Sequence, residues 1–198
     1  SRIQSIDTTH TSQYKYNSDL FAIGNRLYYQ DFTINVSKKF SSKFKGSLSY
    51  VNMIYDKDIL ENEGAPKYGK IKGNFLIMDG TYRIDDKNAI RFELQHLWAK
   101  QDSAAHIGDT RYGNWITALI EYSISPSFYF SVSDVYNYGN EFDDLKIHYY
   151  SASFTYVVGS NRIQLTYGKQ NQGIICVGGV CRTVPASNGL YLSISSSF

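Results

Sequence analysis

Long apolar runs are missing from this sequence. The best of them, such as NFLIM and YVV, fall far short of the roughly 20 apolar residues that a transmembrane helix needs. The mean hydropathy of -0.34 agrees with this shortage. The sequence therefore excludes a transmembrane helix. It does not exclude a membrane β-barrel, because only alternate residues of a barrel strand meet lipid.

An excess of either charge is also missing. Lys and Arg number 20 against 18 Asp and Glu, a formal balance of +2, and no basic block stands out. A nucleic-acid partner is therefore not expected. The chain starts with SRIQSID, with neither an initiating Met nor an apolar signal segment, which predicts a processed or truncated product.

Cysteine is scarce, and both copies lie in the stretch CVGGVC, as Cys176 and Cys181. Two thiols make a weak metal site, because structural zinc normally takes four ligands. A disulfide that closes a small glycine-containing loop is the favoured interpretation, and it indicates an oxidising compartment. Disulfide geometry could still forbid that bond. The sequence predicts no cofactor and no metal.

What the chain has in excess is aromatic residues, with 18 Tyr and 11 Phe but only 3 Pro. Strands favour such a composition. Alternation of apolar and polar residues predicts about nine strands, most of them longer than the five or six residues of a typical strand. The predicted strands are 27–37, 44–55, 73–84, 89–99, 114–124, 127–138, 147–158, 162–170 and 189–198.

The connections between these strands alternate between short turns and longer polar loops. That pattern predicts an all-β, antiparallel, up-and-down transmembrane β-barrel over residues 1–198, with tight periplasmic turns and extended external loops. If RIQSID ends a preceding strand, about ten strands are visible, and bacterial barrels have even counts. The alternative is the C-terminal part of a larger barrel. This alternative is favoured, because residues 1–7 are too few to span a bilayer.

Alternation also assigns the two faces of the predicted sheet. The outward, lipid-facing set is apolar: Ile90, Phe92, Leu94, Ile116, Ala118, Ile120, Tyr122, Tyr150, Phe154, Tyr156, Val158, Ile163, Leu165, Tyr167, Leu192 and Phe198. The inward set contains hydroxyl groups and the predicted lumen-lining charges Asp31, Lys45, Asp79, Arg83, Arg91, Glu93 and Glu121. In a narrow barrel these charges would pair and plug the interior. In a wide barrel they would line a pore.

Aromatic residues cluster at the ends of the predicted strands. They are Tyr28, Tyr55, Tyr82, Trp98, Phe128 and Tyr136. Their amphipathic rings fit the two interfacial girdles of a membrane barrel. For any one of them, high strand propensity is an equally good explanation.

The C-terminus carries the most specific signal. Leu190, Leu192 and Ile194 alternate toward a terminal Phe198, and this pattern resembles the C-terminal assembly signal of Gram-negative outer-membrane barrels. The stretch GIICVGGVCRTVPASNGLYLSISSSF, residues 173–198, is similar to the C-terminal end of a functionally uncharacterised family of Bacteroidetes outer-membrane proteins. Members of that family are longer than this chain.

The resemblance implies a location and partners, but it transfers no functional residue. The implied location is the cell outer membrane. The implied partners are outer-membrane lipid and lipopolysaccharide, the barrel assembly machinery acting through the C-terminal strand, and other outer-membrane proteins.

The leading functional hypothesis is a non-enzymatic one: a passive channel, or a membrane scaffold that presents loops to partners. The alternative is a hydrolase at the barrel rim, similar to lipid A deacylases, phospholipases or omptins. A soluble lipocalin-like barrel is a third possibility.

A rim hydrolase would need a nucleophile and a base within reach of each other. His148 with Ser151 or Ser153 is one candidate, but the two serines have the opposite strand parity and should point inward. His96 is predicted on the lipid-facing side, as His148 is. His10 falls in a predicted external loop. The remaining candidates are external-loop residues: His106 with Asp109, and the acidic pair Asp143 and Asp144. Such acidic pairs are commonly solvated or bound to divalent ions.

Overall fold

The structure is a computed structural model that describes residues 27–61, 67–102, 112–177 and 180–197. It gives the backbone alone for 173–177 and 180–184 and for the short strands β1 (Arg2–Ile3) and β2 (Tyr16–Asn17). All the long elements in these ranges are strands, so the all-β prediction is confirmed.

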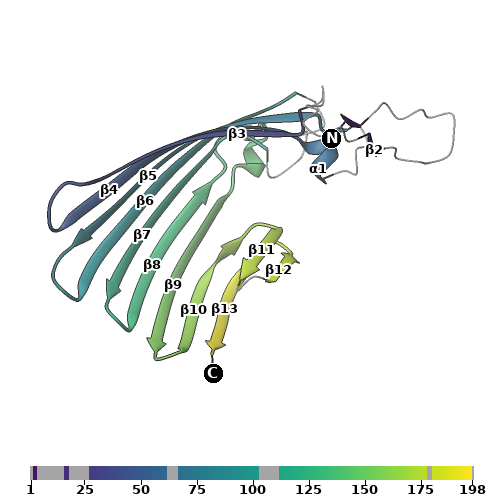
Figure 1. The fold of residues 1–198 in the computed structure, drawn as a ribbon. Coiled ribbons are helices and arrows are strands. Elements are labelled where there is room, and N and C mark those ends of the chain that lie inside the picture. The colour runs from purple at the N-terminus through teal and green to yellow at the C-terminus, as the bar shows by residue number, and fades with distance from the viewer. Residues whose placement is uncertain are drawn as a thin grey trace.

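Nine long strands form one antiparallel sheet in which neighbours in sequence are neighbours in space, as the up-and-down prediction requires (Figure 1). Each of the nine predicted segments corresponds to one strand. The strands are β3 (Tyr29–Lys39), β4 (Phe44–Asp56), β5 (Lys70–Arg83), β6 (Asn88–Gln101), β7 (Trp115–Ile124), β8 (Phe128–Tyr136), β9 (His148–Val158), β10 (Asn161–Gln170) and β13 (Ser187–Ser196).

The sheet is curved but does not close into a barrel, so the prediction of a complete barrel of about ten visible strands is wrong for the described residues. The favoured alternative, the C-terminal part of a larger barrel, stays a prediction. β3 and β13 form the two ends of the strand order. In an antiparallel sheet of nine strands the first and the last run in the same direction, so joining them would need a parallel pair. The expected tenth strand is not there, because β1 pairs with β2 in a small sheet of its own.

Short turns and long connections alternate as predicted, and Figure 1 shows the two kinds at opposite ends of the sheet. The short turns are 40–43, 84–87, 125–127 and 159–160. The long connections are 57–69, 102–114, 137–147 and 171–186. Among the described residues, the first, third and fourth contain elements that the sequence did not predict. These elements are α1 (Lys57–Glu61), the 3-10 helix η2 (Asp143–Leu145) and the hairpin of β11 (Gly173–Val177) with β12 (Val180–Val184).

Side-chain hydrogen bonds shape the short turns. In the turn 84–87 the Asp85 carboxylate accepts hydrogen bonds from the backbone N–H groups of Lys87 and Asn88, both at 2.8 Å. These bonds lower the pKa of Asp85. In the turn 159–160, Gly159 has a φ of 56°, a left-handed conformation that glycine adopts without strain. Such local chemistry fixes the register of each hairpin.

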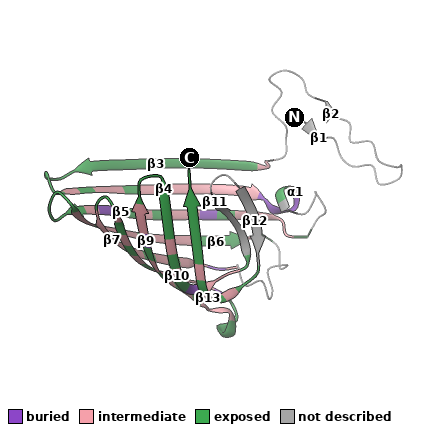
Figure 2. Cartoon of the chain, turned by 90° about the horizontal axis from the view of Figure 1, so that it is seen from below, coloured by how far each residue is buried: buried purple, intermediate pink, exposed green. Residues whose placement is uncertain are grey.

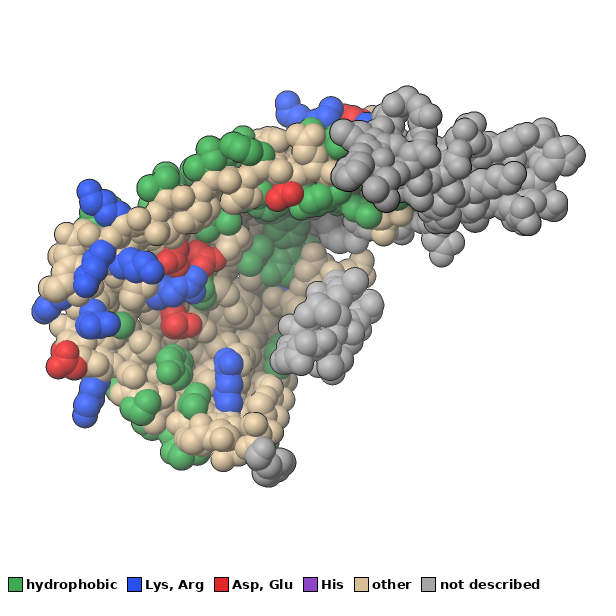
Figure 3. All heavy atoms as spheres, viewed as in Figure 1, with side chains coloured by type: hydrophobic (Ala, Val, Ile, Leu, Met, Phe, Trp, Pro, Cys, Tyr) green, Lys and Arg blue, Asp and Glu red, His purple; other side chains and the backbone are tan. Residues whose placement is uncertain are grey.

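The two faces of the sheet differ in exposure. On β6 the apolar Ile90, Leu94 and Trp98 are exposed, whereas Arg91 and Glu93 between them are only partly exposed. Side chains crowd on the inner side of a curved sheet and splay on its outer side, so the apolar face is the convex one. Figure 3 shows basic and acidic side chains gathered in the hollow of the sheet.

The described residues contain no hydrophobic core. None of their hydrophobic side chains is buried, and buried residues lie in short stretches of the chain (Figure 2). The molecule therefore presents two large surfaces, an apolar convex face and a more polar concave face.

Candidate functional site on the concave face

Strand register brings the predicted lumen-lining charges of the central strands together. One row across the sheet runs Lys45, Thr81, Arg91 and Glu121, on β4 to β7. The next row on the same face pairs Asp79 with Glu93. Because side chains two residues apart share a face, these rows are adjacent, and their charges face the same space.

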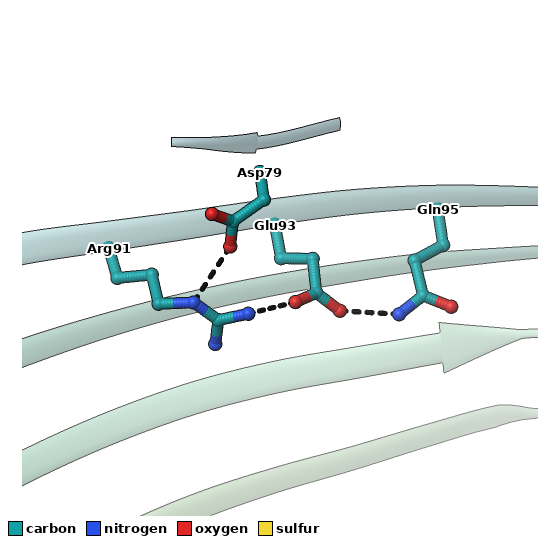
Figure 4. A network of polar contacts seen from close by, with 4 residues as sticks. All are labelled: Asp79, Arg91, Glu93 and Gln95. Atoms are coloured by element: carbon teal, nitrogen blue, oxygen red, sulfur yellow. Dashed lines mark hydrogen bonds and ion pairs between the residues drawn. The ribbon is translucent and has the colours of Figure 1, made fainter. Parts of the chain in front are cut away.

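Arg91 is the centre of a polar network on this face (Figure 4). Its Nε donates to Asp79 Oδ2 at 2.7 Å, and its Nη2 donates to Glu93. Glu93 also accepts a hydrogen bond from Gln95. The network therefore contains two carboxylates for one guanidinium, and Glu121 lies directly across from Arg91 in the register. Lys45 in the same row and Arg83 on the same face add cations, so this part of the concave wall carries charges of both signs.

The other predicted lumen residues lie apart from this network. Asp31 is on the edge strand β3, opposite Met53 and close to the long connections. Lys45 and Arg83 lie toward the short turns, near the first residue of β4 and at the last residue of β5. Within the described part of the chain, none of these three shares an ion pair with Arg91, Asp79 or Glu93.

Beyond β7 the concave face is lined by neutral hydroxyl groups. Ser133 Oγ and Ser151 Oγ are 2.8 Å apart, and Ser153 Oγ and Thr166 Oγ1 are 2.7 Å apart. These bonds join neighbouring strands, so the hydroxyl groups stay satisfied while facing inward. The concave wall thus has a half rich in charges and a half lined mainly by hydroxyl groups, where Arg162 lies beside Gln164.

The hydrolase hypothesis can be tested against the surroundings of His148. Ser151 and Ser153 bond to partners on the concave face, as their parity predicts, so His148 does not meet them. Its Nδ1 lies 2.6 Å from Asp134 Oδ2, and its ring stacks on Tyr136 with 3.8 Å between centroids. Sequence reasoning missed this pair, although Asp134 has the parity of the lipid-facing set.

Aromatic residues line both ends of the convex face, as predicted for most of them. At the long-loop end His96 Nε2 lies 2.5 Å from Tyr138 Oη, and the His96 ring meets Trp98 edge-on at 3.9 Å. Tyr82 and Phe128 are exposed near the short turns. Tyr55 is an exception, because its parity places it on the concave face.

The acidic pair in the connection after β8 lies in η2. Asp143 Oδ1 accepts a hydrogen bond from Lys146 Nζ at 2.6 Å, and this contact lowers the pKa of Asp143. Both carboxylates are exposed. An exposed carboxylate paired with lysine is a solvated loop feature rather than a converging acid–base pair.

Three further predictions fall on other parts of the chain. His10, His106, Asp109 and Phe198 lie outside the described residues. The backbones of Cys176 and Cys181 are directly opposite each other in the β11–β12 hairpin, while their side chains lie outside the described part. The disulfide therefore stays a prediction.

The described ranges contain neither a candidate metal cluster nor a candidate membrane-spanning helix. Among those residues no group of three or more His, Cys, Asp and Glu side chains could hold a metal ion. No helix found there has the length and apolarity that crossing a membrane requires.

Comparison with known proteins adds a family assignment. The family described as "Family of unknown function (DUF6029)" matches residues 1–198. No curated protein and no solved structure matches the chain. The similarity covers the whole sequence printed here and brings no activity with it.

Proposed function

This chain belongs to the DUF6029 family of unknown function, and we propose that its sheet forms part of the wall of a β-barrel in the outer membrane of a Gram-negative bacterium of the Bacteroidetes type. In this proposal the convex face meets lipid and the concave face lines an aqueous lumen. The barrel acts as a passive channel.

The observation that carries the proposal is the inverted exposure of the two faces. Leu192, Val132 and Ile120 on the convex face are 64%, 63% and 60% exposed, whereas the Glu93 side chain on the concave face is 17% exposed. A soluble barrel fills its interior with apolar side chains and turns polar ones outward. Apolar side chains at such exposure would be costly in water and favourable in hydrocarbon.

The backbone hydrogen bonds between the strands also support a membrane environment. A bilayer core tolerates only segments whose backbone polar groups are paired, and the inner strands of this sheet are paired on both sides along ten or so residues, which is the length that spans hydrocarbon. The outer edges of β3 and β13 would pair with further strands of a larger barrel.

The concave wall has the chemistry of a water-filled passage. The Arg91 network provides fixed charges of both signs, and Lys45 and Arg83 add cations on the same face. The other half of the wall carries mainly hydroxyl groups, together with Arg162. Charges of both signs favour a passage without strong ion selectivity.

The proposal keeps the partners that the sequence implied. The convex face would contact outer-membrane lipid and, near the long connections, lipopolysaccharide. The exposed row Leu190, Leu192 and Ile194 on β13 would be recognised by the barrel assembly machinery. In an oxidising compartment the opposed Cys176 and Cys181 backbones favour the disulfide.

Conductance of the purified protein in planar lipid bilayers tests the channel. We expect steady, voltage-independent openings without strong selectivity between K⁺ and Cl⁻. A protein that inserts but conducts nothing would overturn the channel and favour the scaffold, with its long connections as the functional part. A protein that stays monodisperse in buffer without detergent would overturn the membrane location.

The rim hydrolase has one observation in its favour, the contact between His148 and Asp134, since an imidazole oriented by a carboxylate can act as a general base. Turnover of a fluorescent phospholipid or peptide, abolished in His148→Ala and retained in His96→Ala, would establish it. Equal background turnover in all three proteins would eliminate it.

A further inference from the structure

Lysine and arginine side chains gather at the end of the sheet where the short turns lie (Figure 3). Within two residues of these turns, cations outnumber carboxylates, of which only Asp85 and Asp86 lie there. The chain as a whole is nearly balanced, with 20 Lys and Arg against 18 Asp and Glu. The charge of the molecule is therefore unevenly distributed, and the short-turn end is basic.

Three of these cations are neighbours on the concave face. Lys39 on β3 and Lys45 on β4 are direct partners in the register. On its other side Lys45 is paired with Thr81 of β5, and Arg83 follows Thr81 by two residues, so it shares the same face. Arg83 donates its backbone N–H to the Lys43 carbonyl oxygen at 2.7 Å, which continues the β4–β5 pairing up to the turn. The side chains of Lys39, Lys45 and Arg83 therefore lie together in one area, which we call the basic corner.

The positive charge of the basic corner is not neutralised by the described part of the chain. None of its three cations takes part in an ion pair or a side-chain hydrogen bond there. Asp79, in the next row, already bonds to Arg91. Asp85 accepts hydrogen bonds within its own turn and has Lys43 as its nearby cation. Asp86 is exposed in the middle of that turn.

Protection of the sheet edge does not explain this arrangement. Two lysines directly opposite each other on one face of an antiparallel pair are destabilising. A lysine on an edge strand can prevent edge-to-edge aggregation. That role covers Lys39 on β3, but Lys45 and Arg83 are on inner strands. Cations that repel one another and have no structural partner indicate a ligand of opposite charge.

The side chains of the basic corner match the chemistry of phosphate. Arg83 has a planar fork of N–H donors that fits phosphate oxygens bidentately, and lysine is a common phosphate ligand. Thr81 adds a hydroxyl group directly opposite Lys45. All three cations are exposed, so each would hold a single negative charge weakly in water. An anion with two or more charges contacts several cations at once and is therefore the favoured ligand.

We propose that Lys39, Lys45 and Arg83 bind a multivalent phosphate-bearing solute, such as a diphosphate, at the short-turn end of the concave face. The inference rests on the proposed function in placing this end of the face at the mouth of an aqueous passage. Lipid headgroups carry the same phosphate chemistry, but in the proposed function lipid meets the convex face. The basic corner therefore concentrates phosphate-bearing solutes at one mouth of the passage, while monovalent ions pass with little selection.

Isothermal titration calorimetry with inorganic pyrophosphate tests the site, with the protein in phosphatidylcholine nanodiscs at low ionic strength. We expect binding to the unmodified protein and its loss at high salt, which screens exposed charges. Lys45→Gln and Arg83→Gln should each weaken binding about fivefold, the upper end for one exposed ion pair. Both positions are exposed, so neither change is expected to impair folding.

Arg162→Gln is the matched control for these variants. It removes one cation from the same face and the same end of the sheet, where the register partners of Arg162 are the uncharged Val157 and Ser195. We expect its pyrophosphate affinity to equal that of the unmodified protein. Equal weakening in Arg162→Gln and Lys45→Gln would overturn the proposal, because it would show a general effect of charge. Absence of pyrophosphate binding at low ionic strength would overturn it as well.

Native mass spectrometry distinguishes a solute from a lipid headgroup as the source of the phosphate. The unmodified protein and Lys45→Gln are released from membranes that contain phosphatidylglycerol, and the lipid that each protein retains is compared. We expect equal retention, because the basic corner is on the face opposite to lipid. A loss of retained phosphatidylglycerol in Lys45→Gln would overturn the solute as the ligand.

Conductance is recorded on the same preparations, because calorimetry needs no ion current. Pyrophosphate binding without conductance would overturn the channel and support the site in the basic corner. Conductance without pyrophosphate binding would overturn this inference alone.

Discussion

The convex and concave faces of this sheet are made from the same strands, yet they follow opposite rules of burial. Adjacent residues Leu165 and Thr166 on β10 illustrate the difference. Leu165 is exposed among other apolar side chains, whereas Thr166 is half-buried and bonded to Ser153. In water the more exposed face of a sheet is normally the polar one. The comparison therefore supports the proposal that the apolar convex face meets lipid and the polar concave face meets water.

The largest effect is expected from placing one charge on either face. Leu165→Arg should destabilise the protein by roughly 2–4 kcal/mol, the cost of arginine at the lipid midplane of a barrel. Thr166→Arg, one residue later, should cost only the Ser153 hydrogen bond, about 1 kcal/mol. Urea unfolding in lipid vesicles, followed by tryptophan fluorescence, measures both. Equal losses of unfolding free energy in Leu165→Arg and Thr166→Arg would show that the two faces do not meet different solvents.

A smaller effect is expected from packing on the convex face. The Phe92 ring covers Gly80 so closely that an added Cβ would come within 2.2 Å of the ring, whereas a Cβ on its cross-strand neighbour Gly46 would meet nothing nearer than 3.4 Å. Gly80→Ala should therefore displace Phe92 and cost roughly 1–3 kcal/mol. Gly46→Ala should be neutral or slightly stabilising. The same unfolding measurement applies, and a neutral Gly80→Ala would show that Phe92 moves freely.

On the concave face the expected effect is on ions more than on stability. Arg91→Gln leaves Asp79, Glu93 and Glu121 together without their cation. The reversal potential in a KCl gradient should shift toward the potassium equilibrium potential, while unfolding changes by about 1 kcal/mol or less, because the pair is partly exposed. Arg162→Gln removes the same charge beside Gln164 and should shift the potential less. A larger shift of the reversal potential in Arg162→Gln than in Arg91→Gln would show that the Arg91 network does not line the passage.

The smallest effect lies in the turn 84–87, which belongs to neither face and provides a baseline. Hydrogen bonds from the N–H groups of Lys87 and Asn88 lower the pKa of Asp85 from its ordinary 3.8. Because the pKa of Asp85 is lower in the folded protein than in the unfolded chain, the ionised carboxylate stabilises the turn at pH values above the pKa of the unfolded chain. This stabilisation is lost as the pH falls through the pKa of the folded protein. The protection factors of the Lys87 and Asn88 amides, which correct for the intrinsic pH dependence of exchange, should therefore fall below about pH 4.

In Asp85→Ala, the Lys87 and Asn88 amides should already have low protection factors at neutral pH. Asp86→Ala removes the adjacent carboxylate and should leave the protection factors unchanged. Unchanged exchange in Asp85→Ala would mean that the hairpin register holds the turn without its side chain.

Local patterns predicted much of this fold. Alternation of period two located all nine long strands and assigned Arg91 and Ile90 to opposite faces, because side-chain direction depends only on position within a strand. The short breaks between alternating segments located the short turns. The long connections were harder, because α1 and the β11–β12 hairpin are too short to show a periodic pattern.

Contacts that depend on register could not be predicted in the same way. The pairing of Asp79 with Glu93, and of Asp134 near His148, follows from alignments between strands that a single strand does not encode. The pocket lined by Met53, Gly73 and Leu97 needs β4, β5 and β6 at once. Curvature is likewise collective, so its extent could not be predicted from single strands.

The nine long strands of the described residues have a consequence for the proposed barrel. An even total keeps every neighbouring pair antiparallel, so the rest of such a barrel would contribute an odd number of strands. A second copy with the same membrane orientation would present β3 to β13 as a parallel pair, which makes self-association a poor way to seal the ring. The odd number of strands in this sheet therefore favours closure of the proposed barrel by a segment that differs from this sheet.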